Sequence, residues 1–295
     1  MCRLAAFPPG TPADVALEIV NDFEGHNKDG FGYGFLKGNY FVAKKFPMSF
    51  SDTLKSGARI FDHMPHKGWT VAHVRMKTHG IVKEENTHPF IRGNYMTAHN
   101  GVWSAADTAR PWLSMFVKFK GETDSEVASY LIHRMTPKGW WNTIYSGVYL
   151  SLQRNGSLHI AKGLGDAEFF RSKCGPFIAS EFPKGWKSHK FSDNCYHSYD
   201  KNGKLVEAEE KKYSYGGGSS NSSHIGMERQ GRDRHDGKCG GIKGRNSLFC
   251  AQDYPEDDDN KTIAAVTSRE FKDYIEKKIE NREYNPQPGL WEMRD

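Results

Sequence analysis

Six short β-rich runs constrain the fold of this chain of 295 residues more than any other feature. They lie at residues 39–45, 69–75, 94–99, 146–152, 157–162 and 176–180. Glycine or asparagine turn signals bound several of them, such as Asn155-Gly156, which is typical of a tight hairpin. The runs come in pairs with helical segments inserted between them, unlike the regular strand-helix alternation of a doubly wound sheet. We therefore predict an α+β fold of packed antiparallel sheets flanked by helices.

Two helices are predicted from the spacing of apolar residues. Thr11-Pro12 has the form of a helix N-cap followed by proline at the first helical position, and apolar residues from Val15 to Phe23 then repeat on one face. This helix would follow directly on an amino-terminal strand. A second helix is predicted from Asp124 to Met135, where apolar residues again recur at helical spacing.

The composition changes near Ser214, where a segment rich in Gly, Ser and Asn begins. Such a segment cannot bury enough apolar surface to order itself, so it predicts a flexible linker. We expect a globular domain over residues 2–213, a flexible Gly/Ser-rich and then charged linker over 214–261, and a C-terminal helix and tail over 262–295. An apolar stripe in this last segment could dock on the domain or on a partner.

The charges are spread along the chain. There are 41 basic and 36 acidic residues, a formal net charge of +5, and no concentrated basic stripe. Nucleic-acid binding, which uses such a stripe to neutralise phosphates, is therefore not predicted. No run of about 18 apolar residues is present for a membrane span, and the N-terminus lacks the pattern of a secretory leader. We expect a cytoplasmic protein with no membrane partner.

The chain has five cysteines, an odd number with no CxxC pair. They are Cys2, Cys174, Cys195, Cys239 and Cys250. This pattern predicts neither a disulfide framework nor a standard zinc site. We expect no metal and no cofactor, and at least one thiol that is free for chemistry.

Cys2 has the position of an N-terminal nucleophile. If Met1 is removed, this residue supplies both a thiol that can attack and a free α-amine that can act as the base. The reference pKa values of the amine, about 7.7–8.0, and of the thiol, about 8.5, are close enough for proton transfer near neutral pH. The pattern predicts an N-terminal-nucleophile hydrolase. The alternative for Cys2 alone is a small residue that starts the first strand.

The pair Asn100-Gly101 follows the apparent strand 94–99. It offers a side-chain amide and a backbone N–H, which are the donors that stabilise a tetrahedral oxyanion. Taken alone, an Asn-Gly pair is more often a hairpin turn. His99 is expected to be a structural histidine with its hydrogen bonds satisfied, because the amine already serves as the base. Trp69 and Trp140-Trp141 are expected to pack in the core.

Charged side chains on both sides of this pair could bind an amino acid. Arg75 could hold a carboxylate bidentately, Thr78 and His79 in the loop after it could add single hydrogen bonds, and Asp124 could receive an ammonium group. The alternatives are a surface salt bridge for Arg75 and a helix N-cap for Asp124. Together with a nucleophile and an oxyanion hole, these residues describe a pocket for a free α-amino acid with a side-chain carbonyl group, and glutamine fits.

Seven segments, in this order and spacing, resemble one known family. They are Met1-Cys2-Arg3-Leu4, Asn27-x-Asp29-Gly30-x-Gly32-x-Gly34, Arg75-x-x-Thr78-His79-Gly80, Asn86-x-His88-Pro89-Phe90, His99-Asn100-Gly101, Thr123-Asp124-Ser125-Glu126 and Ala179-Ser180-Glu181. Residues 2 to about 182 thereby resemble the class II glutamine amidotransferase domain, an N-terminal-nucleophile (Ntn) hydrolase unit. The resemblance implies a four-layered αββα sandwich.

By the same resemblance, Cys2 is the catalytic nucleophile and Asn100 and Gly101 form the oxyanion hole. The implied substrate-binding residues are Arg75, Thr78, His79 and Asp124. The implied reaction hydrolyses the side-chain amide of glutamine through a cysteine thioester and releases glutamate and ammonia. Residues 183–295 show no ATP pyrophosphatase signature, Walker A loop or sugar isomerase domain, so a separate synthetase or amide ligase is expected to accept the ammonia.

Two other interpretations stay open. An N-terminal-cysteine amidase would act on γ-glutamyl or other amide conjugates without passing ammonia on. A non-catalytic scaffold would keep the fold and bind a partner through its tail.

Overall fold

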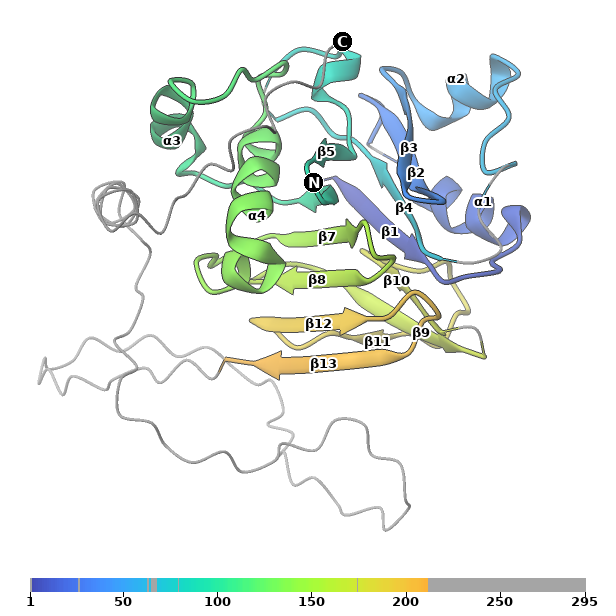
Figure 1. The fold of residues 1–295 in the computed structure, drawn as a ribbon. Helices are drawn as coiled ribbons and strands as arrows, with labels where there is room; N and C mark the ends of the chain where they lie inside the picture. Colours follow the sequence, from blue (N-terminus) through green and yellow to red (C-terminus); the bar gives the residue numbers. More distant parts are fainter. Residues whose placement is uncertain are drawn as a thin grey trace, which may run out of the picture. The chain divides into compact units, whose positions relative to one another are not determined.

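The computed structural model describes residues 2–25, 27–62, 64, 68–78, 80–173 and 175–211. Within these residues the strands form two antiparallel sheets (Figure 1). The seven-stranded sheet has the order β11-β9-β10-β1-β4-β2-β3. Its strands are β1 (Arg3–Phe7), β2 (Phe31–Lys37), β3 (Tyr40–Phe46), β4 (Thr70–Val74), β9 (Glu168–Ser172), β10 (Gly175–Ala179) and β11 (His189–Lys190).

The six-stranded sheet has the order β13-β12-β8-β7-β6-β5. Its strands are β5 (Phe90–Arg92), β6 (Tyr95–Asn100), β7 (Val148–Gln153), β8 (Leu158–Lys162), β12 (Cys195–Tyr199) and β13 (Leu205–Glu210). The six predicted strands are confirmed to within two residues at each end, whereas strands such as β2 and β12 were not predicted.

Helices cover the outer face of each sheet. The helices α1 (Ala13–Asp22) and α2 (Phe50–Lys55) share an apolar cluster with the first sheet. The helices α3 (Ala106–Leu113) and α4 (Asp124–Trp141) share another with the second sheet, where α4 packs on β5, β6 and β8 (Figure 1). A short 3-10 helix, η1 (Glu84–Asn86), precedes β5. The predicted α+β class and αββα layering are confirmed.

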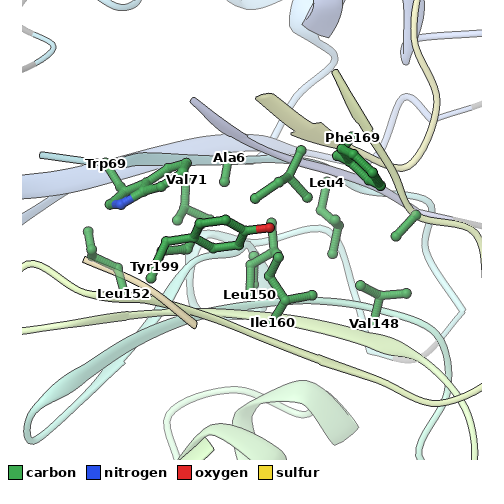
Figure 2. Packing of buried hydrophobic residues seen from close by; sticks show 14 of the residues in the cluster. Leu4, Ala6, Trp69, Val71, Val148, Leu150, Leu152, Ile160, Phe169 and Tyr199 are labelled. Atoms are coloured by element: carbon green, nitrogen blue, oxygen red, sulfur yellow. The ribbon is translucent and has the colours of Figure 1, made fainter. Parts of the chain in front are cut away.

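The main core lies between the two sheets. Figure 2 shows Leu4, Ala6 and Val71 of the first sheet facing Leu150 and Ile160 of the second. Because side chains alternate along a strand, the neighbouring residues Ala5 and Ala72 face the helices instead. Each sheet therefore buries both faces, one against the other sheet and one against helices.

The helix starts differ in detail from the prediction. The N-cap of α1 is Pro12 and not Thr11, whose hydroxyl donates to the carbonyl of Pro8 at 2.7 Å. The helix predicted over 124–135 is confirmed, and α4 continues to Trp141 after a break at Thr136. Core packing is also confirmed for the tryptophans, since Trp69, Trp140 and Trp141 are buried.

Strand β1 lies at the centre of the seven-stranded sheet, between β4 and β10. Arg3 pairs with Val74 and Ala5 pairs with Ala179. The residue before β1 is Cys2 and the residue after β4 is Arg75, so the antiparallel register brings these two residues together at one edge of the sheet.

Two predictions concern parts that lie outside the described residues. The linker over 214–261 and the helix and tail over 262–295, with the boundary at 213, stay predictions. In the part of the chain that the structure describes, no helix is both long enough and apolar enough to cross a membrane.

Candidate active site

A cleft opens where β1 and α4 begin and where β4 and β6 end. Its lining residues are Cys2, Arg75, Met76, Thr78, His88, His99, Gly101, Thr123, Asp124 and Ser125. Five of the seven residues predicted for the site are among them. Asn100, the last residue of β6, is 4% exposed and is not a lining residue, and His79 lies outside the described residues.

The thiol of Cys2 is held by the backbone of Met76. The sulfur lies 3.3 Å from the Met76 carbonyl oxygen, to which it donates, and accepts from the Met76 N–H at 3.3 Å. Burial raises the pKa of this thiol above its usual value, while the Met76 hydrogen bond and the charge of Arg75 act in the opposite direction. The thiol is therefore protonated at neutral pH and needs a base before it can attack.

Arg75 is fixed through its main chain. Its N–H donates to the Gly30 carbonyl at 2.7 Å, and its carbonyl accepts from the Asp29 N–H at 3.0 Å. The Asp29 carboxylate also accepts from the Lys77 N–H at 2.7 Å. Only 2% of Arg75 is exposed, so the surface salt bridge considered for it is wrong. The motif around Asp29 and Gly30 thus positions the segment that carries the arginine and holds the thiol.

The loop after Thr78 is held by side chains from two other segments. The guanidinium of Arg75 donates to the Ile81 carbonyl at 3.1 Å. Asn86 donates to the same carbonyl at 2.9 Å, and Glu122 accepts from the Ile81 N–H at 3.1 Å. Asn86 and Glu122 also bond to each other, through the Glu122 N–H and Asn86 Oδ1 at 2.7 Å. The loop that follows the cleft residue Thr78 is therefore fixed by hydrogen bonds at Ile81.

Asp124 is the first residue of α4. The N-cap is Thr123, whose hydroxyl accepts from the Glu126 N–H at 3.3 Å, so the N-cap role considered for Asp124 is wrong. The Asp124 carboxylate instead accepts from the Trp103 N–H at 2.7 Å and from the Ser125 hydroxyl at 3.3 Å. These bonds hold a carboxylate at the cleft that Arg75 also lines.

Gly101 follows the end of β6 and has φ of +145°. A Cβ atom there would come within 2.8 Å of the Gly147 Cα and 2.9 Å of His99 Nε2, so only glycine fits. The chain continues into α3, and β6 pairs with β5 and β7. The hairpin considered for Asn100-Gly101 is therefore wrong.

Only one of the two ring nitrogens of His99 has a hydrogen-bond partner among the described residues. Its Nδ1 lies 3.0 Å from the Ser125 hydroxyl, and its ring stacks on Tyr149 with centroids 4.1 Å apart. Nε2 is buried and has no hydrogen-bond partner among the described residues, so the expectation that its hydrogen bonds are satisfied is wrong for this nitrogen. Burial lowers the pKa of His99, which keeps the imidazole neutral.

His88 is a cleft residue that the sequence did not assign. It is 3% exposed, its ring centroid lies 3.9 Å from that of His73, and neither of its ring nitrogens has a hydrogen-bond partner among the described residues. Burial lowers its pKa well below the usual value. The motif Asn86-x-His88-Pro89-Phe90 was the available signal. Met76, Thr123 and Ser125 were also missed, because they act through the backbone or through neighbours.

Among the residues that the structure describes, no group of three or more His, Cys, Asp or Glu side chains is placed to hold a metal ion. The cleft instead combines a thiol, a guanidinium, a carboxylate and a glycine N–H.

Residues 1–143 match the family model of the class II glutamine amidotransferases. The chain therefore contains a class II glutamine amidotransferase domain in this region, which is a little under half of its 295 residues. Its fold agrees, since it superposes on the glutamine phosphoribosylpyrophosphate amidotransferase of Bacillus subtilis with a TM-score of 0.59 at 16% identity, over 71% of this chain and 49% of the other.

Two curated relatives show how much of a related protein this chain covers. It is 32% identical over 150 residues to the Escherichia coli protein YafJ, whose name describes it as a glutamine amidotransferase. This match covers 47% of the present chain and 56% of YafJ. It is 30% identical over 122 residues to the glutamine–fructose-6-phosphate aminotransferase of Pectobacterium atrosepticum, covering 41% of this chain and 20% of that enzyme. The chain therefore spans about a fifth to a little over half of the length of these relatives.

Proposed function

We propose that this amidotransferase hydrolyses the side-chain amide of glutamine through Cys2. The observation that carries the proposal is the single cleft that Cys2, Arg75 and Asp124 line together. A guanidinium and a carboxylate complement the α-carboxylate and α-ammonium groups of a free amino acid. With both groups bound, the side chain of the substrate extends toward the thiol.

The proposed chemistry begins with proton transfer from the thiol to the α-amine of Cys2, directly or through a water molecule. The sulfur then forms a bond to the amide carbon, and the oxyanion accepts hydrogen bonds from the Gly101 N–H and the Asn100 amide. The C–N bond breaks as the ammonium returns its proton to the leaving nitrogen, which departs as ammonia. Water then cleaves the γ-glutamyl thioester to glutamate and restores the thiol.

The amine is proposed as the base because the groups around the thiol do not replace it. Met76 offers only backbone atoms to the sulfur, and burial keeps His88 and His99 neutral with depressed pKa values. This part of the proposal requires removal of Met1. N-terminal sequencing of the purified protein should give cysteine first, and a retained Met1 would contradict the mechanism.

The two free cysteines in the described residues supply a matched test. Cys2 lines the cleft, whereas Cys195 is buried in the core between the sheets, where burial raises its pKa to about 12. In a glutaminase assay, Cys2→Ala should lose at least about 10³-fold in kcat, as expected for a nucleophile. Cys195→Ala should keep wild-type kcat. Equal activity of Cys2→Ala and the wild type would end the proposal.

We further propose that ammonia passes to an acceptor held by another polypeptide, a synthetase or amide ligase. A relative whose name states an acceptor is the glutamine–fructose-6-phosphate aminotransferase, of which this chain covers 20%. Comparing free glutamine with γ-glutamyl conjugates separates this proposal from a plain amidase. Faster cleavage of γ-glutamyl conjugates than of free glutamine would contradict the proposal and indicate a plain amidase. Faster cleavage of free glutamine would support it.

A further inference from the structure

The motif Ala179-Ser180-Glu181 has no part in the chemistry proposed above. Ser180 directly follows β10 and is 3% exposed. Its N–H donates to the Leu4 carbonyl at 2.9 Å, and its hydroxyl accepts from the Leu4 N–H at 3.0 Å. Two hydrogen bonds therefore tie Ser180 to β1, two residues after the thiol of Cys2.

The same hydroxyl contacts the second sheet. Asn100, the last residue of β6, places its Nδ2 atom 3.2 Å from Ser180 Oγ. Ser180 is thus in contact with both the strand that follows the nucleophile and the residue proposed to hold the oxyanion. No other side-chain hydroxyl in the described residues is bonded to both Leu4 and Asn100.

The contact between Ser180 and Asn100 leaves one buried oxygen atom without a hydrogen bond in the part of the chain that the structure describes. Asn100 Oδ1 is buried without a hydrogen-bond partner among the described residues. The hydroxyl hydrogen of Ser180 is its natural donor, since a hydroxyl can accept from Leu4 and donate to a second partner. A half-turn of the Asn100 amide exchanges its oxygen and nitrogen at nearly the same positions and pairs these two groups. That orientation also releases both Nδ2 hydrogens.

We propose that Ser180 is a positioning residue for the oxyanion hole, an inference that rests on the proposed function. Its hydroxyl accepts from the Leu4 N–H and donates to Asn100 Oδ1, so that both Nδ2 hydrogens of Asn100 stay available to the oxyanion. Ser180 thereby fixes the oxyanion donor of one sheet relative to the nucleophile strand of the other. The distance matters because a donor must lie about 2.7–3.1 Å from the oxyanion.

The test uses single and double variants of the full chain in the glutaminase assay. Ser180→Ala should lower kcat about 10- to 100-fold, as expected for a misplaced catalytic group, and should leave KM little changed, because the oxyanion forms only after binding. Asn100→Ala should lower kcat roughly 10²- to 10³-fold. The double variant should be no slower than Asn100→Ala, because Ser180 acts through that residue.

Two controls separate positioning from a loss of structure. Ser151→Ala removes another buried hydroxyl, bonded to Thr97 at 3.1 Å on the second sheet, and should keep wild-type kcat. Ser180→Thr keeps the hydroxyl and should recover kcat relative to Ser180→Ala. Wild-type kcat in Ser180→Ala, or losses that multiply in the double variant, would overturn the positioning role.

The amide orientation can be checked without any variant. A crystal structure with a bound substrate analogue, at a resolution that distinguishes nitrogen from oxygen, should show Asn100 Oδ1 toward Ser180. Nδ2 toward Ser180 in that complex would overturn the inference. These failures differ from failure of the proposed function, which would appear as full glutaminase activity in Cys2→Ala.

Discussion

The two ends of strand β4 differ in whether the buried polar side-chain atoms around them have hydrogen-bond partners. Directly before the strand, Trp69 is fully buried and its indole N–H donates to the Asp200 carbonyl at 2.8 Å. Near its other end, His73 Nδ1 and both ring nitrogens of His88 are buried without a hydrogen-bond partner among the described residues. Because buried polar atoms are nearly always paired, the cleft end leaves part of its pairing to water or a ligand. Stability and chemistry are thus separated along one strand.

The largest expected effect is on stability at the Trp69 end. Trp69→Ala removes a ring that packs 5.7 Å from the Tyr199 ring and should lower the free energy of unfolding by about 3–5 kcal/mol. Urea unfolding measures the loss. The kcat per folded molecule should stay at the wild-type value, and a fall in kcat of the folded fraction would break the comparison.

At the other end of β4, Arg75→Lys should weaken the binding of glutamine. Lysine cannot reproduce the planar bidentate grip of arginine, and a hydrogen bond to a charged group is worth about 1.5–3 kcal/mol, so KM for glutamine should rise about 10- to 100-fold. The matched control is Arg59→Lys, at an arginine whose side chain is 81% exposed. An unchanged KM in Arg75→Lys would remove Arg75 from the proposed pocket.

The buried imidazoles predict a loss of stability in acid. Burial lowers the pKa of His73 to about 3 in the folded protein, against about 6.5 in the unfolded chain. Below pH 6.5 the unfolded chain therefore binds a proton that the folded protein does not, and the free energy of unfolding falls as the pH decreases toward 3. Each such histidine contributes about 1.4 kcal/mol per pH unit. The contribution is fully present above pH 6.5.

His73→Gln isolates this effect, because glutamine does not titrate. The slope of the free energy of unfolding against pH, measured by urea unfolding between pH 6 and 4, should be shallower in the variant than in the wild type. The same slope in both proteins would show that His73 is not held neutral.

The smallest effect is expected at the helix N-cap beside the cleft. Thr123→Ala removes the hydroxyl that accepts from the Glu126 N–H and should cost about 1 kcal/mol of stability. Ser49→Ala is the matched cap of α2 on the outer face, where the Ser49 hydroxyl accepts from the Asp52 N–H at 3.0 Å. If Thr123→Ala destabilised the protein as much as Trp69→Ala, the cleft end would carry stability as well.

The layers of the fold could be predicted because apolar alternation and turn signals are local. Strand β2 escaped prediction because Gly32 and Gly34 lower its strand propensity. Tertiary packing explains these glycines, since a Cβ at Gly32 would come within 2.1 Å of the His88 carbonyl oxygen. Helix α3 was also missed, because it contains Pro111 and carries a weak apolar pattern.

The site could be predicted as a set of residues more fully than as a set of contacts. Cys2, Arg75 and Asp124 stand out by residue type and motif, and all three line the cleft. The hydrogen bonds that hold them join segments far apart in the sequence, such as Asp29 and Lys77. The local spacing of residues does not predict such a pair. Ser180 shows the same limit, because its partner Asn100 is eighty positions away in the sequence.

The central place of β1 has a consequence for synthesis on the ribosome. A nascent chain that stops before Gly175 already contains the thiol, the arginine and the glycine of the cleft, but β1 then has only one of its two neighbouring strands. The second neighbour, β10, is made about a hundred residues after β4. An unfinished translation product therefore carries the cleft residues that we propose for attack on an amide, yet lacks the strand that completes the sheet around them.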